Sequence, residues 1–323
     1  MNELTVVYIL CTDQVDYAFL VAANATLAKA VVPEFRRVCV MDRATRRFLQ
    51  RSAVELEPWV DELVLADSPE RNPLLSSRYL KTTLRHLIKG DYLALDIDAV
   101  LADSSAFHHL NYTALAAAPN LDHLRLAPAF PVEIGRTIYQ PMGWEHPVQP
   151  YVNTGVLLCR DNELAHRFYS RWHELWLAQK QQLNIHLDQP AFNRCLWENP
   201  TYLTLLPSSF NSPVDVGADF EQGASVYHYY ISIYSGRPRR DSLLGITARE
   251  IQRRGRMNKS LLRFLLKQKR AFIPQAYDRR LAVRERLWRH ALALWWDGHV
   301  TTEPAQAMKP FRFRASPATN QKA

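Results

Sequence analysis

The sequence predicts an α/β protein with a mostly parallel sheet flanked by helices, followed by a basic helical extension. Three observations support this fold class. The chain has 323 residues, 47% of them apolar, which is enough to bury a large core. Runs rich in β-branched residues alternate with segments of helical period, a pattern typical of parallel sheets. The C-terminal part is strongly basic, unlike the rest of the chain.

Strands and helices alternate in the first part of the chain. Strands are predicted at residues 4–11, 36–41 and 60–67, and helices at residues 17–31 and 43–53. Residues 76–90 predict another helix, which starts at Ser76 and ends at Gly90. It leads into an apolar strand, YLALDID, at residues 92–98. This βαβαβ order favours a parallel sheet.

Patterns in the second part of the chain are less regular. Residues 104–150 are rich in Pro, His and Ala without a clean period, so we expect an irregular segment that faces an acceptor. Strands are predicted at residues 151–159, 203–207 and 224–236, a helix at residues 164–179, and a polar and then helical segment at residues 186–197.

Charge divides the chain near Gly236. Residues 1–236 carry 19 Lys and Arg against 26 Asp and Glu, a net charge of −7, whereas residues 237–323 carry 21 against 6, a net charge of +15. We therefore predict one domain over residues 1–236 and a basic amphipathic helical extension over residues 237–323.

Apolar residues in the extension recur at the three-and-four spacing of amphipathic helices. They are Leu261, Phe264 and Leu265 in one stretch and Leu281, Trp288, Leu292 and Trp295 in the next. A basic and aromatic surface over residues 249–296 suggests binding to an anionic membrane. The alternative is that these helices pack on the domain with a solvated arginine face, which we favour for residues 281–296. Nucleic acid ranks below both, because no nucleic-acid-binding fold is recognisable.

The cysteines and the N-terminus indicate the compartment. Cys11, Cys39, Cys159 and Cys195 are far apart among apolar neighbours, which predicts reduced, buried thiols. The N-terminus lacks the basic region of a signal peptide, and no apolar run approaches the roughly 18 residues of a spanning helix. We expect a cytoplasmic protein, soluble or peripheral on the inner face of the membrane.

Two carboxylates, Asp96 and Asp98, end the apolar strand at residues 92–98. Burying them is costly unless a partner compensates the charge, so they predict either a bound cation or an exposed loop. Ligands of open α/β sheets bind outside the carboxyl ends of the strands, where Thr12 and Asp13 also fall. This position favours a cation such as Mn²⁺ or Mg²⁺. His228, in an aromatic stretch, is either a core residue or a further ligand.

Seven short motifs occur in order along residues 4–236: ILCTD, RYLK, YLALDID, VNTGVLL, LDQPAFN, LPSSFN and VYHYY. In order and spacing they resemble the retaining GT-A glycosyltransferases of family 8, the group that contains glycogenin and bacterial lipopolysaccharide galactosyl- and glucosyltransferases. The resemblance implies a GT-A, Rossmann-like sheet. It also implies transfer of a hexose from a UDP-sugar to a glycan or glycolipid acceptor, with retention of anomeric configuration.

The resemblance further implies a donor site. Asp96, Asp98 and His228 would bind Mn²⁺, or Mg²⁺, which would bridge the two phosphates of the donor. The residues beside the nucleotide would be Thr12, Asp13, Arg78, Lys81, Asp96 and Ile97. Of the two basic residues, Arg78 matches the family's donor-binding position, and Lys81 is a nearby competitor. The alternative for Arg78 is a surface position.

Asn153 and Asp188 would hydrogen-bond the sugar, and Gln189 would lie next to the anomeric carbon. Glycosyl transfer passes through an oxocarbenium-like transition state while negative charge grows on the departing diphosphate. We expect the metal and Arg78 to stabilise that negative charge, with same-face attack and Gln189 stabilising the positive charge. The alternative for Asn153 is a strand entry, and for Asp188 a helix N-cap.

One feature departs from the family pattern. Many relatives follow the metal-binding histidine with a Gly and a Lys that contacts the diphosphate, whereas this chain continues YYISIYSGRPRR. Either Arg237, Arg239 or Arg240 replaces that lysine, or the lid over the donor differs. Two other functions stay open at this point. One is a nucleotidyltransferase on a similar fold, and the other is a degenerate transferase scaffold that binds anionic membrane or nucleic acid.

Overall fold

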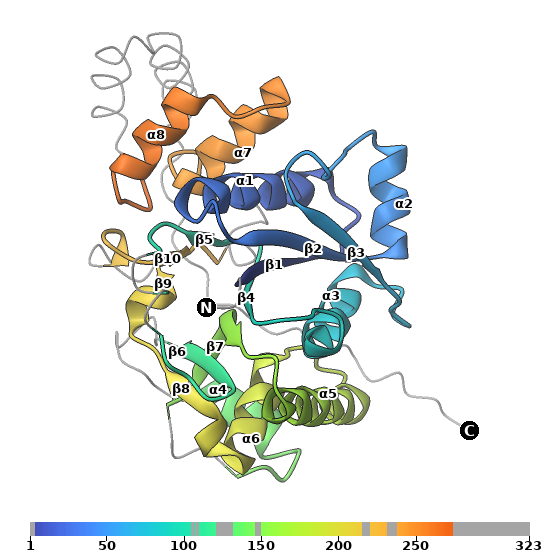
Figure 1. The fold of residues 1–323 in the computed structure, drawn as a ribbon. Helices are drawn as coiled ribbons and strands as arrows, with labels where there is room; N and C mark the ends of the chain where they lie inside the picture. The colour runs from blue at the N-terminus through green and yellow to red at the C-terminus, as the bar shows by residue number, and fades with distance from the viewer. Residues whose placement is uncertain are drawn as a thin grey trace. The chain divides into compact units, whose positions relative to one another are not determined.

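The computed structural model describes residues 4–104, 107, 110–120, 132–145, 150–214, 220–230 and 238–273 (Figure 1). They belong to a compact unit that runs from Met1 to Ile273. The predicted helix at residues 281–296 lies outside the described residues. The domain division predicted at residue 236, which rests on charge, stays a prediction.

A seven-stranded sheet forms the centre of the unit, in the order β3-β2-β1-β4-β7-β6-β8. Its strands are β1 (Thr5–Leu10), β2 (Arg36–Asp42), β3 (Glu62–Ala66), β4 (Tyr92–Leu95), β6 (Leu115–Pro119), β7 (Val152–Cys159) and β8 (Leu203–Leu205). Among these strands, β7 alone runs antiparallel to its neighbours. The predicted mostly parallel α/β fold is confirmed.

Helices cover both faces of this sheet (Figure 1). The helices are α1 (Val15–Val31), α2 (Arg43–Arg51), α3 (Pro73–Thr82), α5 (Glu163–Leu183), α6 (Gln189–Glu198), α7 (Leu243–Arg254) and α8 (Lys259–Lys267). On one face, α1 lies between the sheet and α7, and α3, α5 and α6 cover the other face. Short turns lie at Leu84–His86, Pro200–Tyr202 and Ser208–Phe210, with a short helix α4 (Val132–Ile134) before a π-helical turn at Gly135–Tyr139.

A second, three-stranded sheet was not predicted. It consists of β5 (Ala99–Leu101), β10 (Val226–His228) and β9 (Ser212–Pro213), with β10 antiparallel to β5. The register places His228 opposite Ala99, which directly follows Asp98. Of the strand predicted at residues 224–236, the described part forms β10 only over Val226–His228, and Tyr230 beyond it has a left-handed backbone (φ 45°). Residues 231–236 lie outside the described residues. This small sheet brings the histidine to the end of β4.

The helix predicted at residues 76–90 was wrong at both ends. It begins at Pro73, because the side-chain oxygen of Asn72 accepts a hydrogen bond from the Leu74 N–H at 2.8 Å and caps the first turn. The Ser76 hydroxyl instead donates to Asp42. The helix ends at Thr82, whose β-branched side chain bonds back to the preceding turn.

Residues 104–150 contain a strand where none was predicted. Residues 115–119, LAAAP, are rich in alanine, which has a low strand propensity, so no strand pattern is visible in the sequence. In the fold they form β6 between β7 and β8, where small side chains are buried inside the sheet. Tertiary packing therefore overrides local propensity here.

The described part of the basic extension packs as part of the unit. The predicted apolar face of α8, Leu261, Phe264 and Leu265, is confirmed and is buried. These three side chains are therefore not exposed to a membrane. Among the described helices, none is both long and apolar enough to cross a bilayer. Cys39, Cys159 and Cys195 are buried free thiols, and Cys11 is partly buried, in line with the prediction.

Candidate functional site

A cleft of about 410 Å³ lies at the carboxyl ends of β1 and β4. Seven of the predicted site residues line it: Thr12, Asp13, Arg78, Lys81, Asp96, Ile97 and Asp98. They come from the loop after β1, from α3 and from the turn after β4. The edge of the sheet where ligands were expected to bind is therefore hollow and carries charged side chains among apolar ones.

Asp96, Asp98 and His228 form a cluster at this cleft. Their ligating atoms all lie within 4.8 Å of one another, and Nε2 of His228 is 3.3 Å from Oδ1 of Asp98. Asp98 and His228 are buried, and Asp96 is partly exposed. Two carboxylates and one imidazole suit Mn²⁺, and a hard cation would compensate the buried negative charge. The residues present therefore fit a divalent cation.

Gly155 on β7 gives the histidine ring its space. A Cβ atom at this position would lie 2.3 Å from Cε1 of His228 and 2.9 Å from Oδ1 of Asn153. The Gly155 carbonyl also accepts a hydrogen bond from the Asp96 N–H at 2.8 Å. Any side chain at position 155 would therefore displace the cluster, so the chain needs glycine here.

A second set of charges surrounds Asp188. Arg78 Nε lies 3.2 Å and Lys81 Nζ 3.6 Å from this carboxylate, and the Thr154 hydroxyl donates to it at 3.0 Å. Burial raises the pKa of Asp188, but Lys81, Arg78 and the Thr154 hydrogen bond together hold that pKa below its ordinary value. Asp188 occupies the N-cap position of α6 without a side-chain capping bond. The position is that of the N-cap alternative, but the side chain pairs with Arg78, Lys81 and Thr154 and does not cap the helix.

Arg78 and Lys81 both face the cleft rather than the outer surface. The Lys81 ammonium lies 2.7 Å from Oδ1 of Asp96, and its side chain is buried. Burial lowers the pKa of Arg78, but the carboxylates of Asp188, Asp96 and Asp98 raise it above its usual range. The surface alternative for Arg78 is wrong, and both cations belong to the site.

The predicted sugar-facing residues Asn153 and Gln189 share a partner that the sequence did not suggest. Asn120 Oδ1 accepts from Asn153 Nδ2 at 3.2 Å and from Gln189 Nε2 at 3.4 Å. The Thr154 N–H donates to Gln189 Oε1 at 3.4 Å. Asn120 follows β6 in the segment predicted to be irregular, so no sequence signal pointed to it. Gln189 and Asn153 are brought together, as the resemblance implies.

The loop after β1 and the turn after β4 are fixed by internal hydrogen bonds. The Thr12 hydroxyl accepts from the Gln14 N–H at 2.9 Å, so this side chain shapes the loop, while Asp13 is exposed at the cleft. The Ile97 carbonyl accepts from Nδ2 of the buried Asn24 on α1 at 2.6 Å. Asn24 thereby positions the turn that carries both acidic residues.

Two tyrosines attach β10 to the chain after α8. The Tyr227 hydroxyl donates to the Lys269 carbonyl at 2.6 Å, and the Tyr229 hydroxyl donates to the Ala271 carbonyl at 2.8 Å. Tyr227 and Tyr229 flank His228 in the sequence. The position of the histidine therefore depends on a segment far along the chain.

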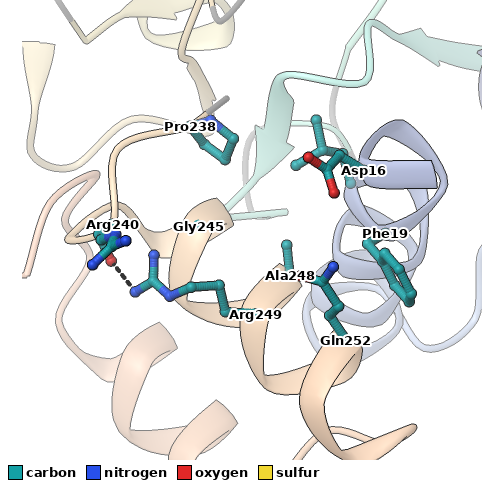
Figure 2. Close-up of a pocket in the computed structure, with 9 residues that line it drawn as sticks. Asp16, Phe19, Pro238, Arg240, Gly245, Ala248, Arg249 and Gln252 are labelled. Carbon is teal, nitrogen blue, oxygen red and sulfur yellow. Dashed lines mark hydrogen bonds between the residues drawn. The ribbon is translucent and has the colours of Figure 1, made fainter. Parts of the chain in front are cut away.

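The arginines proposed to replace a family lysine lie elsewhere. Arg239 pairs with Asp241 at 2.6 Å and covers the ring of Phe272 at 4.1 Å. Arg240 lines a separate pocket of about 270 Å³ between α1 and α7, where the Arg249 side chain donates to the Arg240 carbonyl at 2.5 Å and Asp16 lies on the opposite wall (Figure 2). Neither arginine lines the cleft, and Arg237 lies outside the described residues.

Comparisons with known proteins bear on the fold. No protein-family model matches the sequence, and no curated protein matches it. The galactosyltransferase LgtC, solved with donor and acceptor sugar analogs, is similar with a TM-score of 0.50 and 16% identity over 85% of this chain and 99% of that chain. Mouse xyloside xylosyltransferase 1 has a TM-score of 0.45 and 14% identity over 72% of this chain and 99% of that chain. The similarity to LgtC shows that the chain has the GT-A fold.

Gly155→Ala should weaken Mn²⁺ binding without unfolding the chain, because the new methyl group must displace the His228 ring. We expect the affinity to fall by about 10–100-fold, the typical effect of disturbing the residues that orient a metal ligand. Electron paramagnetic resonance of free Mn²⁺ measures it. Gly143→Ala is the matched control, since that position has open space and a φ of 65°, so it should cost about 1–2 kcal/mol of stability and leave Mn²⁺ affinity unchanged. Equal affinities in the two variants would contradict the prediction.

Proposed function

We propose that the chain is a metal-dependent glycosyltransferase that moves a hexose from a UDP-sugar to a glycan or glycolipid acceptor with retention. The observation that carries this proposal is the Asp96, Asp98 and His228 cluster at a cleft that also contains Arg78 and Lys81. A cluster of side chains that can bind a cation, with two basic side chains at the same sheet edge, suits a nucleotide diphosphate. The GT-A fold and the ordered motifs of family 8 support the same activity.

Each part of the site then has a role. When bound, Mn²⁺ or Mg²⁺ would stabilise the negative charge that grows on the departing diphosphate. Arg78, whose guanidinium is always charged, would add to that stabilisation. Asp13, Thr12 and Ile97 would border the nucleoside in the same cleft. The metal ligands would be Asp96, Asp98 and His228.

The residues that would surround the sugar support attack from the same face as the leaving group. Asp188 is bonded to Arg78, Lys81 and Thr154, and such a paired carboxylate is a weak nucleophile. It is better suited to accept hydrogen bonds from sugar hydroxyls. Gln189 and Asn153 would complete the sugar site, with Gln189 stabilising positive charge at the anomeric carbon.

Asp98→Asn should remove Mn²⁺-dependent binding of UDP. The native chain should bind UDP tightly only with Mn²⁺, and the variant should lose at least about 100-fold in Mn²⁺ affinity, because loss of outer-shell partners alone costs 10–100-fold. Isothermal titration calorimetry measures the UDP affinity with and without Mn²⁺, and a separate titration measures the Mn²⁺ affinity. Asp67→Asn is the control, since Asp67 is exposed and pairs with Arg43 away from the cleft. Absence of UDP binding to the native chain in every condition would favour a degenerate scaffold.

Reaction products separate the proposed activity from nucleotidyl transfer. With a UDP-hexose and Mn²⁺ the native chain should release UDP, whereas UTP and a hexose 1-phosphate should yield no pyrophosphate. A coupled assay distinguishes the two. Proton NMR of the transferred sugar should show the anomer of the donor, and the opposite anomer would rule out retention.

We also propose that the basic extension attracts the chain to an anionic membrane surface on the cytoplasmic side. Arg256, Lys259 and Arg263 are exposed around α8. Replacing all three with Ala should weaken co-sedimentation with phosphatidylglycerol vesicles by about 100-fold, since each basic residue near such a surface contributes roughly 1 kcal/mol. Phosphatidylcholine vesicles are the neutral control. Binding that is insensitive to both salt and the substitutions would contradict an electrostatic attachment.

A further inference from the structure

Asn211 connects the metal-ligand histidine to Asn153. Oδ1 of Asn211 lies 2.8 Å from Nδ1 of His228, and Nδ2 of Asn211 lies 2.9 Å from Oδ1 of Asn153. Asn211 is only 2% exposed and precedes β9. A side chain this deeply buried must satisfy its polar atoms within the protein, so the direction of each hydrogen bond is fixed.

The direction can be deduced from a backbone group. The Gly155 N–H lies 2.8 Å from the Asn153 side chain, and a backbone N–H can only donate. The atom of Asn153 that faces it is therefore the carbonyl oxygen Oδ1. Nδ2 of Asn153 then points the other way, where it donates to Asn120 and to the Tyr230 hydroxyl at 3.3 Å.

The same reasoning extends to Asn211 and then to the histidine. Because Oδ1 of Asn153 is an acceptor, the atom of Asn211 that faces it must be the donor Nδ2. Oδ1 of Asn211 therefore faces His228, and Nδ1 of the histidine must carry the proton that this oxygen accepts. In the neutral ring, which carries a single N–H, Nε2 is then left with a lone pair directed toward Asp98, whose Oδ1 is 3.3 Å away.

Two acceptors that face each other repel unless a cation lies between them. Without Asn211, the histidine would relieve the repulsion by moving its proton to Nε2 and donating to Asp98, which would block Nε2 as a ligand. The histidine ring also has little freedom to rotate away from Asp98 and so relieve the repulsion. Tyr230 stacks on it with centroids 4.1 Å apart and an interplanar angle of 22°, and Gly155 lies next to its Cε1 atom.

We propose that Asn211 is a positioning residue that holds His228 in the Nδ1–H tautomer and so leaves Nε2 open to a divalent cation. The inference rests on the proposed function for the cation itself, but the tautomer is a property of the metal-free chain. It also explains the Asn of the LPSSFN motif, to which neither the sequence nor the resemblance gave a role.

Histidine tautomers can be read directly by long-range ¹H–¹⁵N correlation spectra of the full chain labelled with ¹⁵N-histidine. Spectra recorded without metal at about pH 8 should show Nδ1 of His228 protonated and Nε2 unprotonated. A His228→Gln sample assigns the signal among the 11 histidines. An Nε2–H tautomer in the native chain would overturn the proposal, whatever the variants do.

Two substitutions then test the role of Asn211. Asn211→Leu should move the proton to Nε2 and lower Mn²⁺ affinity by about 10–100-fold, whereas Asn211→Asp, which keeps an oxygen for Nδ1–H, should keep the tautomer and bind Mn²⁺ more tightly than Asn211→Leu. Asn199→Leu is the control, because Asn199 bonds to the Cys195 carbonyl at the end of α6. An Asn211→Leu chain with native tautomer and affinity would contradict the proposal.

The experiment also separates this inference from the proposed function. A native chain with the Nδ1–H tautomer that neither binds Mn²⁺ nor releases UDP would support the tautomer assignment and contradict the glycosyltransferase proposal. A chain that transfers sugar with His228 in the Nε2–H tautomer would support the glycosyltransferase proposal and contradict the tautomer assignment.

Discussion

The rest of the site depends on the ion pairs that the Lys81 ammonium group makes with two carboxylates. This group lies 2.7 Å from Oδ1 of Asp96 and 3.6 Å from Oδ2 of Asp188, and the lysine side chain is buried. Buried carboxylates are tolerated only where opposite charge compensates them, so α3 must bring its cation to this place. Lys81 thereby connects three separate elements, α3, the end of β4 and the start of α6.

Asp96 takes part both in the ion pairs of Lys81 and in the cluster with Asp98 and His228. Its Oδ1 faces Lys81, while its Oδ2 lies on the side of Gly155, 3.0 Å from where a Cβ atom of that residue would be. One carboxylate therefore belongs to both networks. Its two oxygens have different surroundings, and a displacement of α3 would be transmitted to the histidine side of the cluster.

Much of the fold could be predicted because its strands have strong local signals. β1, β2 and β7 are β-branched or continuously apolar runs, which predict buried strands wherever they occur. β6 is mostly alanine, and β5 and β9 are three and two residues long, so their formation depends on neighbours distant in sequence. The acidic pair in β4's turn was visible as a motif, whereas single asparagines such as Asn120 and Asn211 carry no pattern of their own.

The hydrogen bonds that the Tyr227 and Tyr229 hydroxyls donate to the chain after α8 give the basic C-terminal region a structural role in addition to its charge. Because the acceptors are the backbone carbonyls of Lys269 and Ala271, they are present whatever side chains occupy those positions. Sequence drift in the extension therefore leaves this anchorage intact, whereas shortening the chain to residue 236 removes it. The side chains of the extension can therefore vary without loss of the two hydrogen bonds that hold the strand of His228.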